Sequence, residues 1–357
     1  MPATAATDDS VAARRAAVLQ RGVNLSGWFA SSGDLSPQHF DTYTTPADLQ
    51  LIHDAGMQNV RLGVDPVLFT QHGLNSAEST AALARLDLAI DEILQAGLAV
   101  QIVVFPRDDY KQQLANQKGV DDFVMLWRFL AGHFAHRDPE RVFFELMNEP
   151  EVNDPYRWMG IQATVVDAIR KVDGVHTIIA TAAHYSGLGD LLVLQPVNDA
   201  NVIYNFHFYE PYPFTHQGAT WGSSEWNYFH DIPYPATPET LKSAMSGVQD
   251  DSARNVLFQY GAAGWNQQTM LARLQFARDW ADEHHVPLIC NEFGAYRDTA
   301  PADSRVRYIH DVRSDLEHLH IGWAMWDYRG NFGMVARTGP VPVPDERIFG
   351  ALGLTTR

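Results

Sequence analysis

The sequence predicts a single (β/α)8 barrel with a long loop insertion after the sixth strand. Eight short apolar runs recur along the 357 residues, each followed by a polar loop and mostly by a helical pattern. Most runs are almost continuous in valine, isoleucine, leucine and phenylalanine, as strands covered on both faces are. Alternating strands and helices are typical of a parallel sheet, and eight repeats predict that the sheet closes.

The predicted strands are residues 22–25, 59–62, 99–105, 142–146, 177–182, 202–206, 287–291 and 321–325. Amphipathic helices are predicted over residues 79–96, 121–136 and 269–283, where apolar side chains recur at helical spacing. In the first helix, Ser79 or Thr80 can cap the amino terminus, and Gly97 can end the helix.

The alternative fold is an open doubly wound sheet. That fold usually carries a glycine-rich phosphate turn after an early strand. The first predicted strand is followed instead by Asn24-Leu25-Ser26-Gly27-Trp28, which does not match such a turn. The barrel is therefore favoured.

Two segments depart from the regular alternation. Residues 1–20 have no hydrophobic signal core and are predicted to be a flexible leader, or the stub left after signal removal, before one barrel domain over residues 21–357. Residues 210–265 are rich in proline, tryptophan, tyrosine and histidine and are long for a βα loop. Long ordered loops at the carboxyl end of barrel strands are often functional.

Composition limits the classes of partner. A net charge of −17 and a pI near 5.2 argue against nucleic acid or another phosphate-rich partner. No apolar stretch is long enough to span a membrane. The only cysteine, Cys290, excludes a disulfide framework and a cysteine metal site, and we interpret it as a buried filler.

Two glutamates carry the strongest chemical signal. Glu149 follows the apolar run that ends in Met147-Asn148, and Glu292 follows the run that ends in Cys290-Asn291. If both strands belong to one parallel barrel, both carboxylates reach the same mouth. Two carboxylates facing each other across a cleft are what cleavage of a glycosidic bond needs.

Polar and aromatic residues near other strand ends fit the same chemistry. Arg61 can keep a carboxylate nucleophile ionised, and the amide of Asn148 can bind sugar hydroxyls or serve as a turn residue before Pro150. His207 and Tyr209 project from the same side of the sixth strand, toward a hydroxyl and a carboxylate.

Aromatic residues supply candidate surfaces for sugar stacking. Trp326 ends the last strand and is placed in the site, whereas Trp323 is placed in the barrel wall. Several others lie in or near loops, where each can line a sugar groove or pack the loop: Trp28, Phe29, Trp221, Trp226 and Trp265.

Other catalytic chemistries lack their motifs. There is no His-Glu-x-x-His sequence, and the paired histidines at positions 284–285 and 318/320 do not follow a strand. A Gly-x-Ser-x-Gly elbow is also absent. We therefore expect no metal and no cofactor.

With these residues in this order, the chain resembles glycoside hydrolase family 5 from Arg21 to Trp326. Leu146-Met147-Asn148-Glu149-Pro150 is similar to the acid/base motif, and Ile289-Cys290-Asn291-Glu292-Phe293-Gly294 is similar to the nucleophile motif. The resemblance also covers Arg61, the His207-x-Tyr209 pair and Trp326. It implies a (β/α)8 barrel in which residues 21–357 are catalytic.

One position departs from the family. Many members have a histidine at the end of the third strand, where this chain has Val104-Phe105-Pro106-Arg107-Asp108. Arg107 or Asp108 is a candidate to replace part of its function. Residues 209–219, which include His216, resemble cellulase-like members.

The resemblance implies a retaining endo-β-1,4-glucanase acting on a β-linked polysaccharide or oligosaccharide. The alternatives are another β-glycanase acting on mannan, xyloglucan or an exopolysaccharide, a transglycosylating member, and an inactive sugar-binding barrel. We expect a monomer that is secreted or periplasmic, its signal peptide missing from this sequence, with a cytoplasmic location as the alternative.

Overall fold

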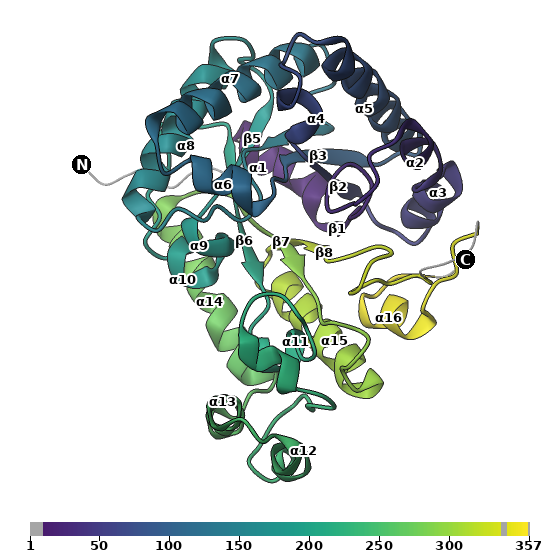
Figure 1. Cartoon of the computed structure of the whole chain (residues 1–357), viewed down its shortest axis with the longest axis vertical. Coiled ribbons are helices and arrows are strands. Elements are labelled where there is room, and N and C mark those ends of the chain that lie inside the picture. The colour runs from purple at the N-terminus through teal and green to yellow at the C-terminus, as the bar shows by residue number, and fades with distance from the viewer. Residues whose placement is uncertain (1–9, 337–340, 356–357) are drawn as a thin grey trace.

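The computed structural model describes residues 10–336 and 341–355, and within them eight parallel strands close into one barrel in chain order (Figure 1). The strands are β1 (Arg21–Asn24), β2 (Asn59–Val64), β3 (Ala99–Val104), β4 (Val142–Glu145), β5 (Thr177–Thr181), β6 (Val202–Phe208), β7 (Leu288–Phe293) and β8 (Gly322–Met325). The predicted fold class is confirmed, and β2, β6 and β7 extend further at their carboxyl ends than the sequence pattern indicated.

Helices surround the barrel, as Figure 1 shows for the long helices α5, α7, α8, α14 and α15. The helices are α1 (Val11–Ala16), η1 (Ala17–Leu19), α2 (Pro37–Thr42), α3 (Pro46–Asp54), α4 (Val67–Thr70), α5 (Ala77–Gln95), α6 (Asp108–Gln113), α7 (Gln117–Phe134), α8 (Pro155–Arg170), α9 (Ala183–Ser186), α10 (Leu188–Leu191), α11 (Tyr212–Thr215), η2 (Ser224–Tyr228), α12 (Lys242–Gly247), α13 (Asp251–Ala263), α14 (Gln267–His284), α15 (Ala302–His318) and α16 (Glu346–Ala351). None of the described helices is long and apolar enough to cross a membrane.

The three helices predicted from apolar spacing form α5, α7 and α14. The predicted cap of α5 was wrong: Ser76, not Ser79 or Thr80, accepts a hydrogen bond at the helix start, from the Ser79 amide at 3.0 Å. Ser79 is itself buried in the first turn. Gly97 follows the helix with a positive φ of 88°, which suits a residue without a Cβ.

Residues 11–19 form helical turns, so the prediction of a flexible leader was wrong for them, whereas the alternative of a stub is untested; residues 1–9 lie outside the described residues. Ala12 and Ala16 of α1 and Leu19 of η1 pack on strand side chains inside the barrel, including Phe143 and Ile289. An apolar helix face therefore closes the end of the barrel opposite the carboxyl ends of the strands.

Arg15 fixes this amino-terminal helix to the barrel. It donates hydrogen bonds to the Val175 carbonyl at 2.6 Å and to Thr177 at 3.0 Å, and it pairs with Glu140. This contact was not predicted, because a local sequence pattern does not identify the distant partner of a single arginine.

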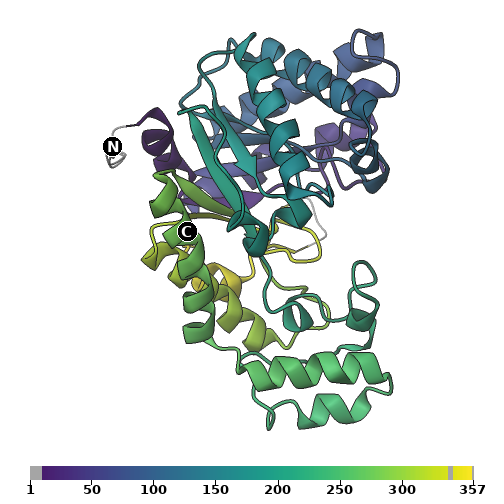
Figure 2. The ribbon, with the colours of Figure 1, turned by 90° about the vertical axis from the view of Figure 1, so that its left-hand side faces the viewer.

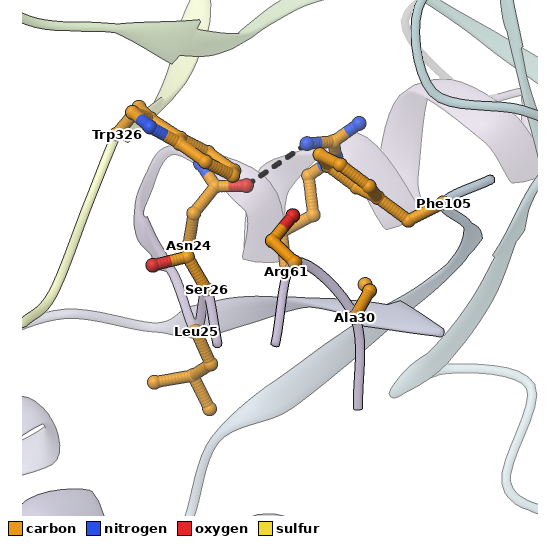
Figure 3. A pocket seen from close by; sticks show the side chains of 9 residues that line it. Asn24, Leu25, Ser26, Ala30, Arg61, Phe105 and Trp326 are labelled. Atoms are coloured by element: carbon orange, nitrogen blue, oxygen red, sulfur yellow. Dashed lines mark hydrogen bonds between the residues drawn. The ribbon is translucent and has the colours of Figure 1, made fainter. Parts of the chain in front are cut away.

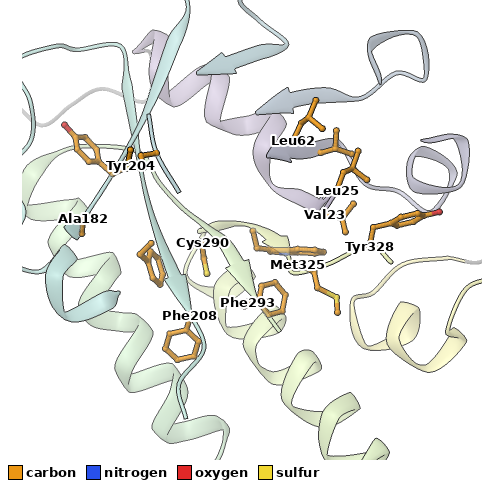
Figure 4. Packing of buried hydrophobic residues seen from close by; sticks show 14 of the residues in the cluster. Val23, Leu25, Leu62, Ala182, Tyr204, Phe208, Cys290, Phe293, Met325 and Tyr328 are labelled. Carbon is orange, nitrogen blue, oxygen red and sulfur yellow. The ribbon is translucent and has the colours of Figure 1, made fainter. Parts of the chain in front are cut away.

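Buried side chains fill the space between the strands and the helices (Figure 4). Cys290 lies there beside Phe293 of the same strand, and burial raises the pKa of its thiol. A buried, protonated thiol is a poor nucleophile, so the interpretation of Cys290 as a core filler is confirmed.

Residues 210–265 form a helical insertion, which contains α11, η2, α12 and α13 and projects from one end of the molecule (Figure 2). Its side chains are anchored on the barrel helices: Tyr234 donates to Asp311 of α15 at 2.9 Å, and Phe214 packs on Tyr308. These contacts attach the insertion to α15 of the barrel.

Candidate active site

Glu149 and Glu292 meet at the carboxyl ends of β4 and β7. One carboxylate oxygen of each, together with a ring nitrogen of His207, lies within 4.8 Å of the other two atoms. Glu292 is 3% exposed, whereas Glu149 is only partly buried. Glu149 has a positive φ of 46°, a conformation that non-glycine residues seldom adopt.

Local irregularities of the sheet aim these side chains. The pairing of β6 with β7 shifts between Phe206 and His207, and that of β7 with β8 shifts between Cys290 and Phe293. Such bulges re-aim side chains at barrel rims. They place His207 directly beside Glu292 in the register.

Arg61 binds polar side chains from several strands at the base of the site. From β2, its guanidinium donates to Glu292 Oε1 at 2.5 Å, to Asn24 at 2.9 Å and to Asn148 at 2.9 Å. Figure 3 shows its hydrogen bond with Asn24. Arg61 is thus the cation beside Glu292, as predicted, and the oxygen of Asn148 faces Arg61.

Glu145 is the residue that the sequence analysis missed. It accepts two hydrogen bonds from Arg61, both at 2.7 Å, and one each from Asn205 at 3.1 Å and Asn291 at 2.9 Å. Its side chain is 1% exposed. A charged residue four positions before Glu149, within an otherwise apolar strand, was the available signal.

The predicted contact of Tyr209 with a carboxylate is confirmed, whereas His207 lies beside both glutamates and its predicted binding of a sugar hydroxyl stays a prediction. His207 Nδ1 lies 2.9 Å from Glu149 and 3.5 Å from Glu292, and Tyr209 donates its hydroxyl hydrogen to Glu292 Oε2 at 2.8 Å. Burial raises the pKa of Tyr209, and the charge of Glu292 adds to that rise, so the phenol remains a donor. Nε2 of His207 is buried without a partner among the described residues.

The pKa values of the two glutamates depart from their ordinary values in opposite directions. Burial raises that of Glu292, and His207 and Arg61 oppose the rise. Burial also acts to raise the pKa of Glu149, but His207 brings it below its ordinary value. Arg61 acts to lower the pKa of Glu292, as the sequence predicted, but burial has the larger effect. The guanidinium also binds Glu145.

Trp326 and Phe105 form an aromatic wall beside Arg61 (Figure 3). Their rings are stacked, with centroids 5.7 Å apart and an interplanar angle of 15°. Phe105 occupies the position after β3 where a histidine was expected from the resemblance. The predicted substitutes lie elsewhere: Arg107 binds Asp65 at 3.0 Å, and Asp108 is exposed at the start of α6.

Two predicted aromatic residues are structural. Trp28 is 1% exposed and donates its indole hydrogen to the Phe40 carbonyl, so its placement in the site was wrong. Trp323 lies in the barrel wall, as predicted. Trp28 meets Phe40 because the chain after β1 returns toward it, and a sequence pattern does not predict that contact.

The aromatic residues of the insertion divide into buried and exposed ones. His216 lies between Tyr209 and Trp226, with ring centroids at 5.1 and 4.6 Å. Trp226 stacks on Tyr212, whereas Trp221 is 44% exposed and touches Tyr296 edge-to-face. His216 connects the insertion to Tyr209, and Trp221 presents free surface. Trp265 packs against the core.

Glu149, His207 and Glu292 are also the described residues that could together hold a metal ion. The donors already present argue against it, because Arg61 and Tyr209 bind both oxygens of Glu292. A guanidinium at 2.5 Å would repel a second cation. The absence of a metal remains a prediction.

The sequence profile of the cellulase family, glycosyl hydrolase family 5, matches residues 12–332. The chain belongs to glycoside hydrolase family 5. The family assignment agrees with the barrel and with the resemblance drawn from the two Asn-Glu motifs.

Several known proteins are similar to most of this family 5 chain. Endoglucanase 3 of Fibrobacter succinogenes is 29% identical over 89% of the chain, which spans half the length of that relative. Endoglucanase C of Acetivibrio thermocellus is 28% identical over 86% of the chain and 90% of the relative. The structure of Thermotoga maritima Cel5A in complex with cellobiose has a TM-score of 0.76 at 24% identity, over 95% of this chain and 98% of that one. The last likeness shows the shared fold.

The stability of this family 5 barrel is expected to depend on pH through His216. Burial lowers the pKa of His216 from 6.5 to about 4. At pH values between these two, His216 is protonated in the unfolded chain but neutral in the folded protein. The free energy of unfolding therefore falls as pH decreases. Denaturant unfolding at pH 7 and pH 4.5 should show wild type losing about 2 kcal/mol more than His216→Phe, which keeps the ring. Equal losses would contradict this expectation.

Proposed function

We propose that this protein is a retaining endo-β-1,4-glucanase that hydrolyses β-glucan through a glycosyl-enzyme intermediate. The observation that carries the proposal is the approach of the Glu149 and Glu292 carboxylate oxygens to within 4.8 Å. Retaining glycosidases hold their two carboxyl groups about 5–5.5 Å apart, and inverting enzymes need about 6.5–9.5 Å to admit a water molecule.

Glu292 is the proposed nucleophile because two donors hold its carboxylate in place. Arg61 binds Oε1 and Tyr209 binds Oε2, so the carboxylate is oriented before the sugar arrives. In the first step a Glu292 oxygen forms a bond to the anomeric carbon, and the bond from that carbon to the leaving oxygen breaks. Orientation of this kind contributes to rate by fixing the attacking atom.

Glu149 is the proposed acid/base. It donates its proton to the leaving oxygen in the first step. In the second step it removes a proton from water, whose oxygen bonds to the anomeric carbon while the bond from that carbon to Glu292 breaks. A bound sugar displaces water from Glu149, which favours its protonated form. Once Glu292 is esterified its negative charge is gone, and the pKa of Glu149 falls again because a like charge has been removed. The nearby His207 also favours the ionised form at that stage.

The names of the relatives support β-1,4-glucan as the substrate. Two of them, at 28–29% identity, are endoglucanases. A structure of Thermotoga maritima Cel5A was determined with mannotriose, which keeps mannan as an alternative substrate for this chain. The stacked pair of Trp326 and Phe105 would accept the flat faces of either sugar.

The proposed activity is tested by a reducing-sugar assay on soluble β-glucan, mannan, xylan and xyloglucan. We expect the largest kcat/KM on β-1,4-glucan, with proton NMR showing the β-anomer as the first product. A first-formed α-anomer would refute retention. Preference for mannan would favour the alternative substrate, and no release from any polymer would favour a sugar-binding barrel.

The two glutamates should respond differently to substitution. Glu292→Gln should abolish turnover on every glycoside because the nucleophile is lost. Glu149→Ala should spare aryl glycosides whose leaving groups need no proton, and azide should partly restore turnover by attacking the intermediate. Glu239→Gln, an exposed carboxylate of the insertion, is the control and should behave like wild type. Azide rescue of Glu292→Ala alone would reverse the roles.

Trp221 should matter more for long substrates than for short ones. Its ring is exposed on the insertion, where it can stack on a sugar unit away from the cleaved bond. Trp221→Ala should lower kcat/KM on polymer by about tenfold while changing an aryl glycoside little. Trp226→Ala is the matched control, because its stacked and half-buried ring should affect melting temperature and both substrates equally. Equal losses for Trp221→Ala would place that residue in the packing of the insertion.

A further inference from the structure

The guanidinium of Arg61 has no hydrogen atom left for a further partner. A guanidinium carries five N–H donors. Two of them bind Glu145, at 2.7 Å each, and one binds Glu292 at 2.5 Å. The other two bind the amide oxygens of Asn24 and Asn148, both at 2.9 Å. Glu145 therefore receives the paired, parallel contact that fixes the plane of a guanidinium.

Glu145 itself is closed off from the substrate. Its side chain is 1% exposed, and both of its oxygens accept two hydrogen bonds. One bond to each oxygen comes from Arg61, and the others come from Asn205 at 3.1 Å and Asn291 at 2.9 Å. Because both amides are neutral, the cation that faces Glu145 is Arg61. Any effect of Glu145 on the reaction must therefore pass through that guanidinium.

The charges that face Arg61 change during the proposed reaction. Burial acts to lower the pKa of Arg61, but the negative charges of Glu145 and Glu292 raise it above its ordinary value. When an oxygen of Glu292 bonds to the anomeric carbon, its electron pair enters the new bond and the negative charge of Glu292 is lost.

The negative charge passes to a group that Arg61 does not bind. Glu149 gives its proton to the leaving oxygen and becomes the charged carboxylate. Its hydrogen-bond partner is His207, at 2.9 Å, and all five donors of Arg61 are engaged elsewhere. In the glycosyl-enzyme, Glu145 is thus the carboxylate that remains paired with Arg61.

We propose that Glu145 is a positioning residue that acts through Arg61, as the counter-ion that keeps the guanidinium paired and in place while Glu292 is bonded to the sugar. The inference rests on the proposed function, because formation of the glycosyl-enzyme is what removes the charge of Glu292. A buried cation without a partner is strongly unfavourable. With Glu145 present, Arg61 stays in an ion pair through both steps and can bind the Glu292 carboxylate again when water releases it.

The proposal predicts that the two steps respond differently to loss of the Glu145 charge. Without that charge, Arg61 pairs with Glu292 alone in the free enzyme and loses this partner in the glycosyl-enzyme. Formation of the ester should therefore be slower, whereas its hydrolysis, which restores the carboxylate, should not be slower. A residue that only supports the fold would change the amount of active protein and would not separate the two steps.

An aryl 2-deoxy-2-fluoro-β-cellobioside separates these steps. Fluorine disfavours the oxocarbenium-like transition state of both steps, and a dinitrophenyl leaving group speeds only the first, so the glycosyl-enzyme accumulates. Trapping is followed by the gain in intact-protein mass, and release by the loss of that mass after the probe is removed. Glu145→Gln, which removes the charge and keeps the shape, should be trapped about a hundredfold more slowly than wild type and released at least as fast.

Two further variants separate the charge from folding. Glu145→Asp keeps the charge but moves it away from Arg61, so its trapping rate should lie between those of wild type and Glu145→Gln, again without slower release. This variant keeps the test decisive if Glu145→Gln does not fold. Asp199→Asn is the matched control, because Asp199 accepts two hydrogen bonds from Arg170, at 2.6 and 3.3 Å, before the amino end of β6. It should lower the melting temperature and leave both rates as in wild type.

The outcomes distinguish this inference from the proposed function. Equal changes in the trapping and release rates of Glu145→Gln or Glu145→Asp would overturn the inference, as would a Glu145→Gln variant with wild-type rates. In either case, a wild-type protein that carries the sugar on Glu292, located by peptide mass, would leave the proposed function intact. A wild-type protein that is not trapped would overturn the proposed function together with this inference.

Discussion

One buried cation, the guanidinium of Arg61, holds the polar residues of the site together. From β2 it binds two carboxylates and two amide oxygens, which come from β1, β4, the loop after β4, and β7. The Arg61 side chain has no exposed surface, so its partners supply the hydrogen bonds that water would otherwise make with the guanidinium. Removing one partner of such a buried pair typically costs about 3–5 kcal/mol. The arrangement exists only because the barrel is closed, since strands far apart in sequence must surround one side chain.

Division of that charge decides how Glu292 is held. Two of the guanidinium hydrogen bonds go to Glu145 and one goes to Glu292. Glu292 therefore shares the cation with a second carboxylate and accepts its other hydrogen bond from the neutral phenol of Tyr209. Asn205 and Asn291 complete the shell around Glu145 without adding charge. The buried layer therefore orients Glu292 and tunes it at the same time.

The two ends of the barrel differ in function. At one end, the apolar face of α1 and the contacts of Arg15 close the barrel and contribute stability. At the other end, the connections after β4 and β6 carry Glu149 and the helical insertion. His216 of the insertion packs on Tyr209, which donates a hydrogen bond to Glu292. Loop variation on a fixed barrel is how this architecture changes the substrates it accepts.

The sequence by itself determined the barrel, the family, and the placement of Glu149, Glu292, Arg61, His207 and Tyr209. Buried parallel strands must be apolar on both faces, and polar residues at their ends stand out against that pattern. Only the tertiary structure decided what depends on packing between distant segments. In the folded protein Trp28 is buried, and residues 10–19 pack against one end of the barrel. Phe105 stacks on Trp326, and Glu145 accepts more of the Arg61 hydrogen bonds than Glu292 does. A local pattern records which residues are apolar or charged; which partner each one meets is fixed by closure of the barrel.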